Sequence, residues 1–157
     1  MPPPPFLETR ELGRMPLVTF GPGSHYYEYV RVSPRGPQYT LTFMVRPPNT
    51  LIADPTALAA DVERFWRQLW SSLDRLAELG EPLVIEQMHK VAESGEALPD
   101  ARALLAADRL YVIEYDATPG LPAPCRLTFN AHELECREIL SVKTTADLHP
   151  VVVQFDG

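Results

Sequence analysis

The stretch His25–Arg31 carries the residues of this sequence best suited to recognition. It holds three tyrosines, Tyr26, Tyr27 and Tyr29, between a histidine and an arginine. Tyrosine and arginine are enriched among the residues that dominate the binding energy of protein interfaces. Aromatic rings beside a cation can also stack on the bases of single-stranded nucleic acid. Side chains alternate between the two faces of a strand. The face on which each ring lies therefore determines whether that ring belongs to a binding surface or to the core.

The register between this strand and the next one decides which side chains share a face. If residues 38–46 form the next strand and residues 34–37 the loop, Ser33 pairs with Gln38. One face is then mostly apolar and carries Tyr26, Glu28, Val30, Val32, Tyr39, Leu41, Phe43 and Val45. The other face carries His25, Tyr27, Tyr29, Arg31, Thr40, Thr42, Met44 and Arg46.

We predict that the apolar face is core. The second face is predicted to be an interaction surface, with a solvated face or one covered by the N-terminal segment as the alternatives. Its candidate binding residues are Tyr27, Tyr29, Arg31, Met44 and Arg46.

Glu28 is the exception on the predicted core face. A buried carboxylate must find a partner or stay protonated, and such an acid can serve in catalysis. A position near the strand end would instead let it reach solvent or an arginine. Together with Glu114 and His25, this possible buried acid is the basis for an enzyme or small-ligand pocket between the sheet and a long helix.

The two cysteines are predicted to lie on consecutive strands. A hairpin that turns at Asn130–Ala131 places Cys125 opposite Cys136 and gives Arg126 the favourable partner Glu135. We expect two adjacent, buried and reduced thiols, with a disulfide as the alternative.

The remaining chemistry-bearing residues form no recognisable motif. His132 lies near the cysteines, so a Cys/His metal site is an alternative there, but the histidines lack the spacing of metal ligands. The glycines and serines match no nucleotide-binding or hydrolase motif. We therefore predict no catalytic residue, no metal and no cofactor.

A long amphipathic helix is the clearest element. Asp54 is a suitable N-cap, Pro55 suits the first turn, and apolar residues recur at helical spacing as far as Leu79. Gly80 is expected to end the helix. Trp66 lies in the apolar stripe. Trp70 lies at its limit, which suggests a boundary position or an oligomer contact.

The order of elements is strands, helices, strands. Shorter helices are expected at 82–94, where a strand is also possible, and at 100–107. Strands are expected at 17–20, 25–33, 38–46, 109–117, 125–131, 133–144 and 150–157. This order predicts an α+β fold: a curved antiparallel sheet of about six to seven strands, with one long helix and one or two shorter helices packed on one face.

The chain of 157 residues suits one domain. We predict a Pro-rich N-terminal arm at 1–13 and a single α+β domain at 14–157. Four prolines favour an extended polyproline II segment, and Phe6 and Leu7 follow it. The arm is expected either to dock through these two side chains or to fray.

The net charge of −7 disfavours nucleic acid as the main partner. No apolar run approaches the roughly 20 residues that span a bilayer, and the N-terminus does not read as a secretory signal. We therefore expect a soluble, cytoplasmic protein without a membrane partner. The leading interpretation is a non-enzymatic interaction or assembly subunit that binds a protein partner or forms a homo-oligomer. Its interaction residues are Tyr27, Tyr29, Arg31, Met44, Arg46, Trp70 and Phe6.

Two other functions stay open. One is the small-ligand-binding protein or enzyme described above. The other is a single-stranded nucleic-acid binder that uses Tyr27 and Tyr29.

Overall fold

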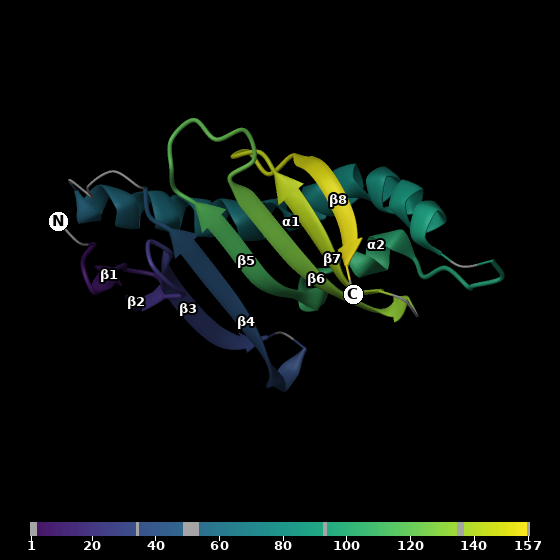
Figure 1. Ribbon diagram of the computed structural model, residues 1–157, viewed down its shortest axis with the longest axis horizontal. Helices are drawn as coiled ribbons and strands as arrows, with labels where there is room; N and C mark the ends of the chain where they lie inside the picture. Colours follow the sequence, from purple (N-terminus) through teal and green to yellow (C-terminus); the bar gives the residue numbers. More distant parts are fainter. Residues whose placement is uncertain (1–2, 34, 49–53, 93, 135–136, 157) are drawn as a thin grey trace.

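A computed structural model describes residues 3–33, 35–48, 54–92, 94–134 and 137–156 (Figure 1). It shows an α+β fold in which an eight-stranded sheet packs against one long helix. The strands are β1 (Phe6–Glu8), β2 (Arg14–Thr19), β3 (His25–Ser33), β4 (Gly36–Arg46), β5 (Leu110–Asp116), β6 (Cys125–Leu134), β7 (Arg137–Thr144) and β8 (Pro150–Asp156). The helices are α1 (Pro55–Val91), α2 (Ala101–Leu104) and a 3-10 turn, Ala107–Arg109.

The strands lie in the sheet in the order of the sequence, from β1 to β8. All neighbours are antiparallel except β4 and β5, which α1 connects as a crossover and which are parallel. The predicted α+β class is confirmed, as are the largely antiparallel sheet and the long helix on one face. The sheet has one strand more than expected because part of the N-terminal arm forms β1, paired with β2.

The helix α1 begins where the sequence predicts. The side chain of Asp54 accepts hydrogen bonds from the backbone N–H groups of Thr56 and Ala57, at 3.0 and 3.3 Å. These bonds satisfy two of the donors that the first turn of a helix leaves free.

The predicted end of this helix at Gly80 is wrong, and the helix expected at 82–94 is the second half of α1. The buried stripe continues through Gly80, Val84 and Met88, so burial outweighs the two helix-breaking residues. A Cβ at Gly80 would lie 3.3 Å from the side chain of Leu105, which shows how closely the helix packs there. Pro82 lies on the exposed side of the helix, where water can satisfy the carbonyl that loses its donor.

The side chains of β4 lie on the faces of the sheet that the sequence predicts. The prediction for β3 is wrong, because its side chains lie on the opposite faces. Tyr27 pairs with Val45, and Tyr29 pairs with Phe43. This register differs by one residue from the predicted one, and a shift of one residue exchanges the two faces of a strand. The shift arises at an irregularity beside Ser33, which pairs with Gly36 and so shortens the loop.

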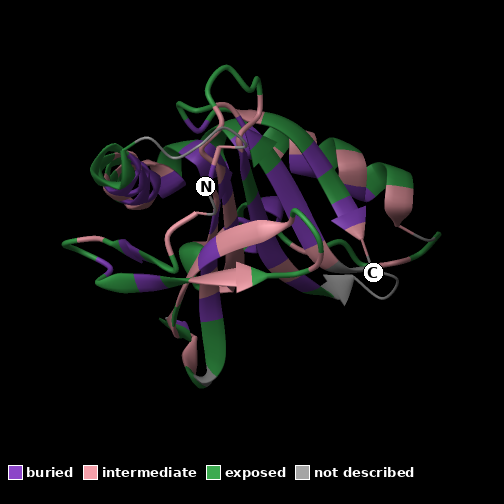
Figure 2. Ribbon diagram, turned by 60° about the vertical axis from the view of Figure 1, so that its left-hand side comes forward, coloured by how far each residue is buried: buried purple, intermediate pink, exposed green. Residues whose placement is uncertain are grey.

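Stacked aromatic rings fill the space between the sheet and α1. Phe65 of the helix stacks on Phe43 and Tyr115 of the sheet, with ring centroids 5.8 and 4.2 Å apart. Trp66 stacks on Phe43 at 5.0 Å. The hydroxyl of Tyr115 donates to Asp61 of α1 at 2.7 Å. Among the described residues, buried side chains of α1 and of the sheet thus meet in the region to which the sequence assigned a possible ligand pocket. Figure 2 shows how the buried residues are distributed over the strands and the helix.

The N-terminal arm is docked on the sheet. Leu7 and Leu12 are buried, and so is Met15 at the start of β2. The hydroxyl of Tyr27, which is fully buried, donates to the carbonyl oxygen of Pro4 at 2.7 Å. This contact ties the polyproline segment to the core.

The predicted pairing of the two cysteines is wrong. Cys125 pairs with Thr144, because β6 continues through Asn130 to Leu134 before the chain reverses. The local turn signal at Asn130–Ala131 produces only an irregularity in the ladder. Cys125 is buried as expected, whereas Cys136 lies outside the described residues.

Burial raises the pKa of the Cys125 thiol from its ordinary value of 9.0 to about 12. In a Cys136→Ser variant at pH 8, we expect this thiol to react with a small alkylating reagent about 100-fold or more slowly in the native protein than in urea. Comparable rates would contradict the burial. Because the folded pKa is the higher one, the stabilisation by this group is complete below pH 9 and is lost as the pH rises from 9 toward 12.

Candidate functional site

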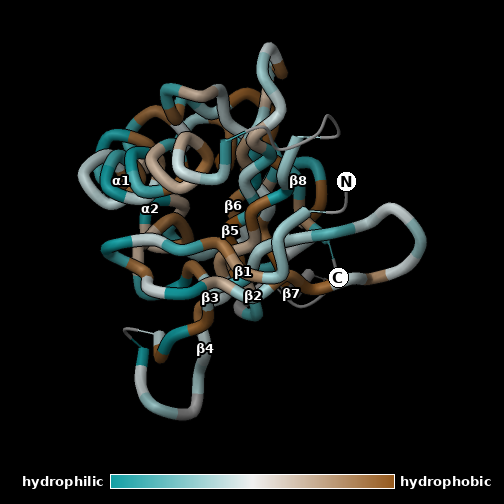
Figure 3. The backbone as a smooth tube through the Cα atoms, turned by 90° about the vertical axis from the view of Figure 1, so that its left-hand side faces the viewer, coloured by the Kyte–Doolittle hydropathy of each residue, from teal (hydrophilic) through white to brown (hydrophobic). Residues whose placement is uncertain are grey.

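The face of the sheet opposite α1 is the main candidate for a functional surface. In Figure 1 the helix lies behind the strands, and Figure 3 shows α1 and α2 on the same side of them. We call the other side of β3–β8 the open face. One row of paired residues across it is Glu28, Met44, Glu114, Arg126, Lys143 and Val152. The adjacent row is Val30, Thr42, Val112, Thr128, Ser141 and Gln154.

A hollow of about 300 Å³ lies at one end of the open face. Its charged lining residues are Arg46, Glu114, Asp116, Arg126 and Lys143, and Tyr26 and Tyr115 are its aromatic ones. Three cations and two carboxylates give this part of an acidic protein a small local excess of positive charge. Anionic groups of a partner would favour such a position.

The charged side chains of the hollow are held by several contacts. The guanidinium of Arg126 lies 3.8 Å from the carboxylate of Glu114 and donates to the hydroxyl of Ser141 at 3.2 Å. The guanidinium of Arg46 lies over the ring of Tyr26, 5.6 Å from its centroid. These pairs are partly exposed, so each adds little stability, but they restrict the orientations of the side chains.

Exposed apolar side chains extend the open face beyond the hollow. Val30 and Val32 of β3 are 48% and 58% exposed, and Val152 of β8 is 46% exposed. Phe20 is 61% exposed and makes an edge contact with Tyr26 at 5.7 Å. Mixed aromatic, arginine and aliphatic surface of this kind is typical of protein interfaces.

The residues predicted to bind a partner are divided between the two faces. Met44 and Arg46 lie half-buried on the open face. Glu28 lies there too, opposite Met44, so the prediction of an acid buried in the core is wrong. Phe6 lies apart from them, exposed on β1.

Tyr27, Tyr29, Arg31 and Trp70 lie on the covered side. Tyr27 is fully buried, so it cannot stack on a nucleobase without opening the core. The ring of Tyr29 meets Trp66 edge-on at 5.6 Å, and the guanidinium of Arg31 lies 4.7 Å from the ring centroid of Trp70. Tyr29 and Arg31 therefore help to hold α1 on β3 through the tryptophans of the helix.

The sequence reasoning missed Tyr26, Phe20, Arg126 and Lys143 as surface residues. Arg126 and Lys143 each lie between two buried residues of their strands, so alternation could have found them. Tyr26 could not have been found in this way because the wrong register placed it in the core.

A scan against protein-family models finds no match to this sequence, and searches of curated proteins and of solved structures find none either. Among the described residues, no helix has the length and apolar character needed to cross a membrane. The same part of the chain holds no group of three or more His, Cys, Asp or Glu side chains placed to bind a metal ion.

Proposed function

We propose that this protein is a non-enzymatic interaction subunit that binds a protein partner through the open face. The observation that carries the proposal is the composition of that face. Tyr26, Arg46 and Met44 lie beside exposed valines on a sheet surface that none of the described helices covers. Tyrosine, arginine and methionine are enriched at interface cores, where exposed aliphatic groups add apolar area.

The lining of the hollow supports a partner with anionic groups. Arg46 and Lys143 are half-exposed and exposed, respectively, so their charged groups can reach a bound molecule. A partner that suits them presents one or more carboxylates next to apolar side chains, which would lie over Val30 and Val152. Complementary charge favours the correct partner and speeds association more than it raises affinity.

The test compares two variants with equal loss of charge. Arg46→Ser with Lys143→Ser alters the open face, and Arg75→Ser with Lys90→Ser alters the exposed side of α1. The partner is first captured on the immobilised wild-type chain from extract of its own cells and is identified by mass spectrometry. Its Kd is then measured by calorimetry with each variant.

We expect the open-face variant to lose about 2 kcal/mol or more of binding free energy, roughly 30-fold in Kd. The α1 variant should bind as the wild type does. The free energies of unfolding of both variants should lie within about 1 kcal/mol of the wild-type value, since the open-face variant loses the exposed contact between Arg46 and Tyr26. Equal Kd values for the two variants would contradict the proposal. It would also fail if no partner were captured and light scattering showed only monomer.

A further inference from the structure

The strand β1 lies at the edge of the sheet, with β2 as its neighbour. Just outside the three-residue pairing, the N–H of Thr9 donates to the carbonyl of Gly13 at 2.8 Å, and the N–H of Leu17 donates to the carbonyl of Pro5 at 2.9 Å. In an antiparallel pair, the residues whose backbone groups face the partner strand alternate with residues whose groups point away. Since Pro5 and Thr9 face β2, the N–H and C=O groups of Phe6 and Glu8 point away from it.

The next residue of the same parity, Arg10, shows what this edge can bind. Its backbone N–H donates to the carboxylate of Glu63 on α1. The carboxylate thus occupies the position that the carbonyl of a further strand would take. Within the described residues, no acceptor lies against the outward N–H groups of Phe6 and Glu8, and no donor lies against their C=O groups. The edge is therefore capped at one end and open over its other two outward-facing residues.

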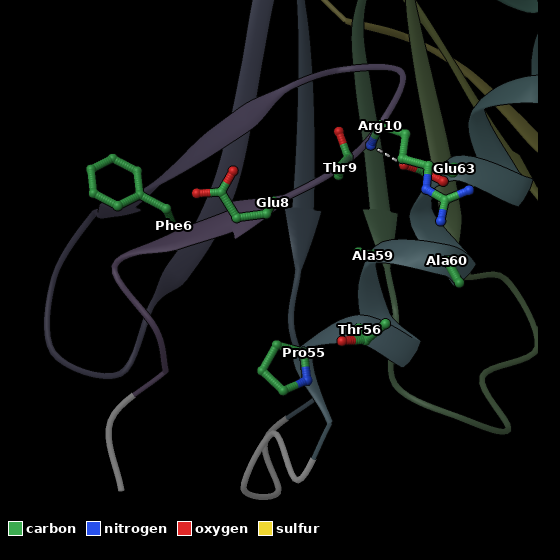
Figure 4. Close-up of a pocket in the computed structure, with 9 residues that line it drawn as sticks. All are labelled: Phe6, Glu8, Thr9, Arg10, Pro55, Thr56, Ala59, Ala60 and Glu63. Carbon is green, nitrogen blue, oxygen red and sulfur yellow. Dashed lines mark hydrogen bonds between the residues drawn. The ribbon is translucent and has the colours of Figure 1, made fainter.

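This open edge borders a groove of about 630 Å³ between β1 and the first turns of α1 (Figure 4). On the helix side of the groove, Glu63 lies at the capped end. The other lining residues of α1 have small or short side chains, namely Pro55, Thr56, Ala59 and Ala60. The strand side is made by Phe6, Glu8, Thr9 and Arg10. Neighbouring strands lie about 4.7–4.9 Å apart, so a strand paired with β1 would lie within this groove.

We propose that the groove binds an extended polypeptide segment of a partner protein, which adds to the sheet as a strand beside β1. The two outward N–H groups and two outward C=O groups are the pattern that an extended backbone recognises. The alanines of α1 leave room for small apolar side chains at alternate positions of the segment. The charges around the groove are largely balanced, since Glu8 forms an ion pair with Arg14 at 2.7 Å and Glu63 accepts from Arg10. The segment is accordingly of low charge.

A single strand fits this groove better than a second copy of the chain. A second copy would bring its own β1 together with β2, which is paired behind it, and with its own α1. Because α1 forms the other side of the groove, the groove has room for a strand beside β1 but not for these further elements of a second copy. This site is separate from the open face, so each proposal can fail without the other.

The test uses proline to remove one outward donor. Glu8→Pro deletes an N–H that points into the groove and leaves the bonds between β1 and β2 in place, since proline is tolerated at a sheet edge. Glu8→Ala removes the same side chain but keeps the N–H and is the matched control. The probe is a random dodecapeptide library displayed on phage and selected on the full chain. The peptide recovered most often is then synthesised and titrated by fluorescence anisotropy.

We expect peptides with small apolar residues at alternate positions. Affinity should fall about tenfold or more with Glu8→Pro and less than about threefold with Glu8→Ala. Bound peptide should also slow the amide hydrogen exchange of Phe6 and Glu8 in the wild-type protein, a measurement that holds even if Glu8→Pro does not fold. The proposal would be overturned if no peptide were enriched or if exchange at these two amides did not change. Equal affinities of the two variants, or a wild-type dimer that Glu8→Pro dissociates, would overturn it as well.

Discussion

Replacing Tyr27 by Ala is expected to lower the free energy of unfolding by about 3–5 kcal/mol, the range for truncation of a buried aromatic ring. The ring is fully buried on the α1 side of β3, where its backbone pairs with Leu17 of β2 and Val45 of β4. The change also leaves the carbonyl oxygen of Pro4 without its hydroxyl donor. Loss of the ring and of this bond should loosen the N-terminal arm together with the core.

The matched control is Tyr26→Ala, the same truncation one residue earlier. This ring is half-buried on the open face, where its contacts are Arg46 and the exposed Phe20. Its loss should cost about 1 kcal/mol, since exposed cation–π and aromatic pairs contribute roughly 0.5–1.5 kcal/mol. Urea denaturation of both variants measures the difference. A larger loss for Tyr26→Ala would restore the register predicted from the sequence and refute the observed one.

Leu69→Ala is expected to cost about 2–5 kcal/mol, because the side chain is fully buried in the middle of α1. Leu69→Met keeps most of the volume and should cost less than about 1.5 kcal/mol. The control Arg67→Ala lies on the exposed side of the helix, where the guanidinium pairs with Glu11 of the arm. Such an exposed pair contributes about 0.2–1 kcal/mol.

Thermal or urea melts of these three variants test the orientation of the helix. If Leu69→Ala and Arg67→Ala had equal stabilities, the buried stripe would lie elsewhere on α1. If Leu69→Met were as unstable as Leu69→Ala, the loss would come from disturbed shape rather than from a cavity.

The candidate site was only partly predictable. On β4 the alternation is clear, since Thr42 and Met44 separate Leu41, Phe43 and Val45, and these three apolar residues are all buried. The faces of β4 were therefore predicted correctly, and Met44 and Arg46 lie on the open face. On β3 both faces carry large side chains, so the pattern allowed either assignment.

The sequence by itself determined the class of fold and the start of the long helix. Asp54 and Pro55 act within one turn of the chain, and the apolar spacing after them needs no distant partner to be recognised. The strands likewise follow from local alternation and from the prolines and glycines between them. These features depend on residues within a few positions of one another.

The tertiary structure alone decided the register, the end of α1 and the docking of the arm. Val30 and Val32 are exposed, and Tyr27 is buried, because α1 covers the other side of β3. Gly80 stays inside the helix because Leu105, distant in sequence, packs against it. In each of these three cases the neighbouring residues in the sequence favoured one conformation only weakly or were compatible with two. The observed conformation was selected by burial against an element that is distant in the sequence and comes into contact only when the chain folds.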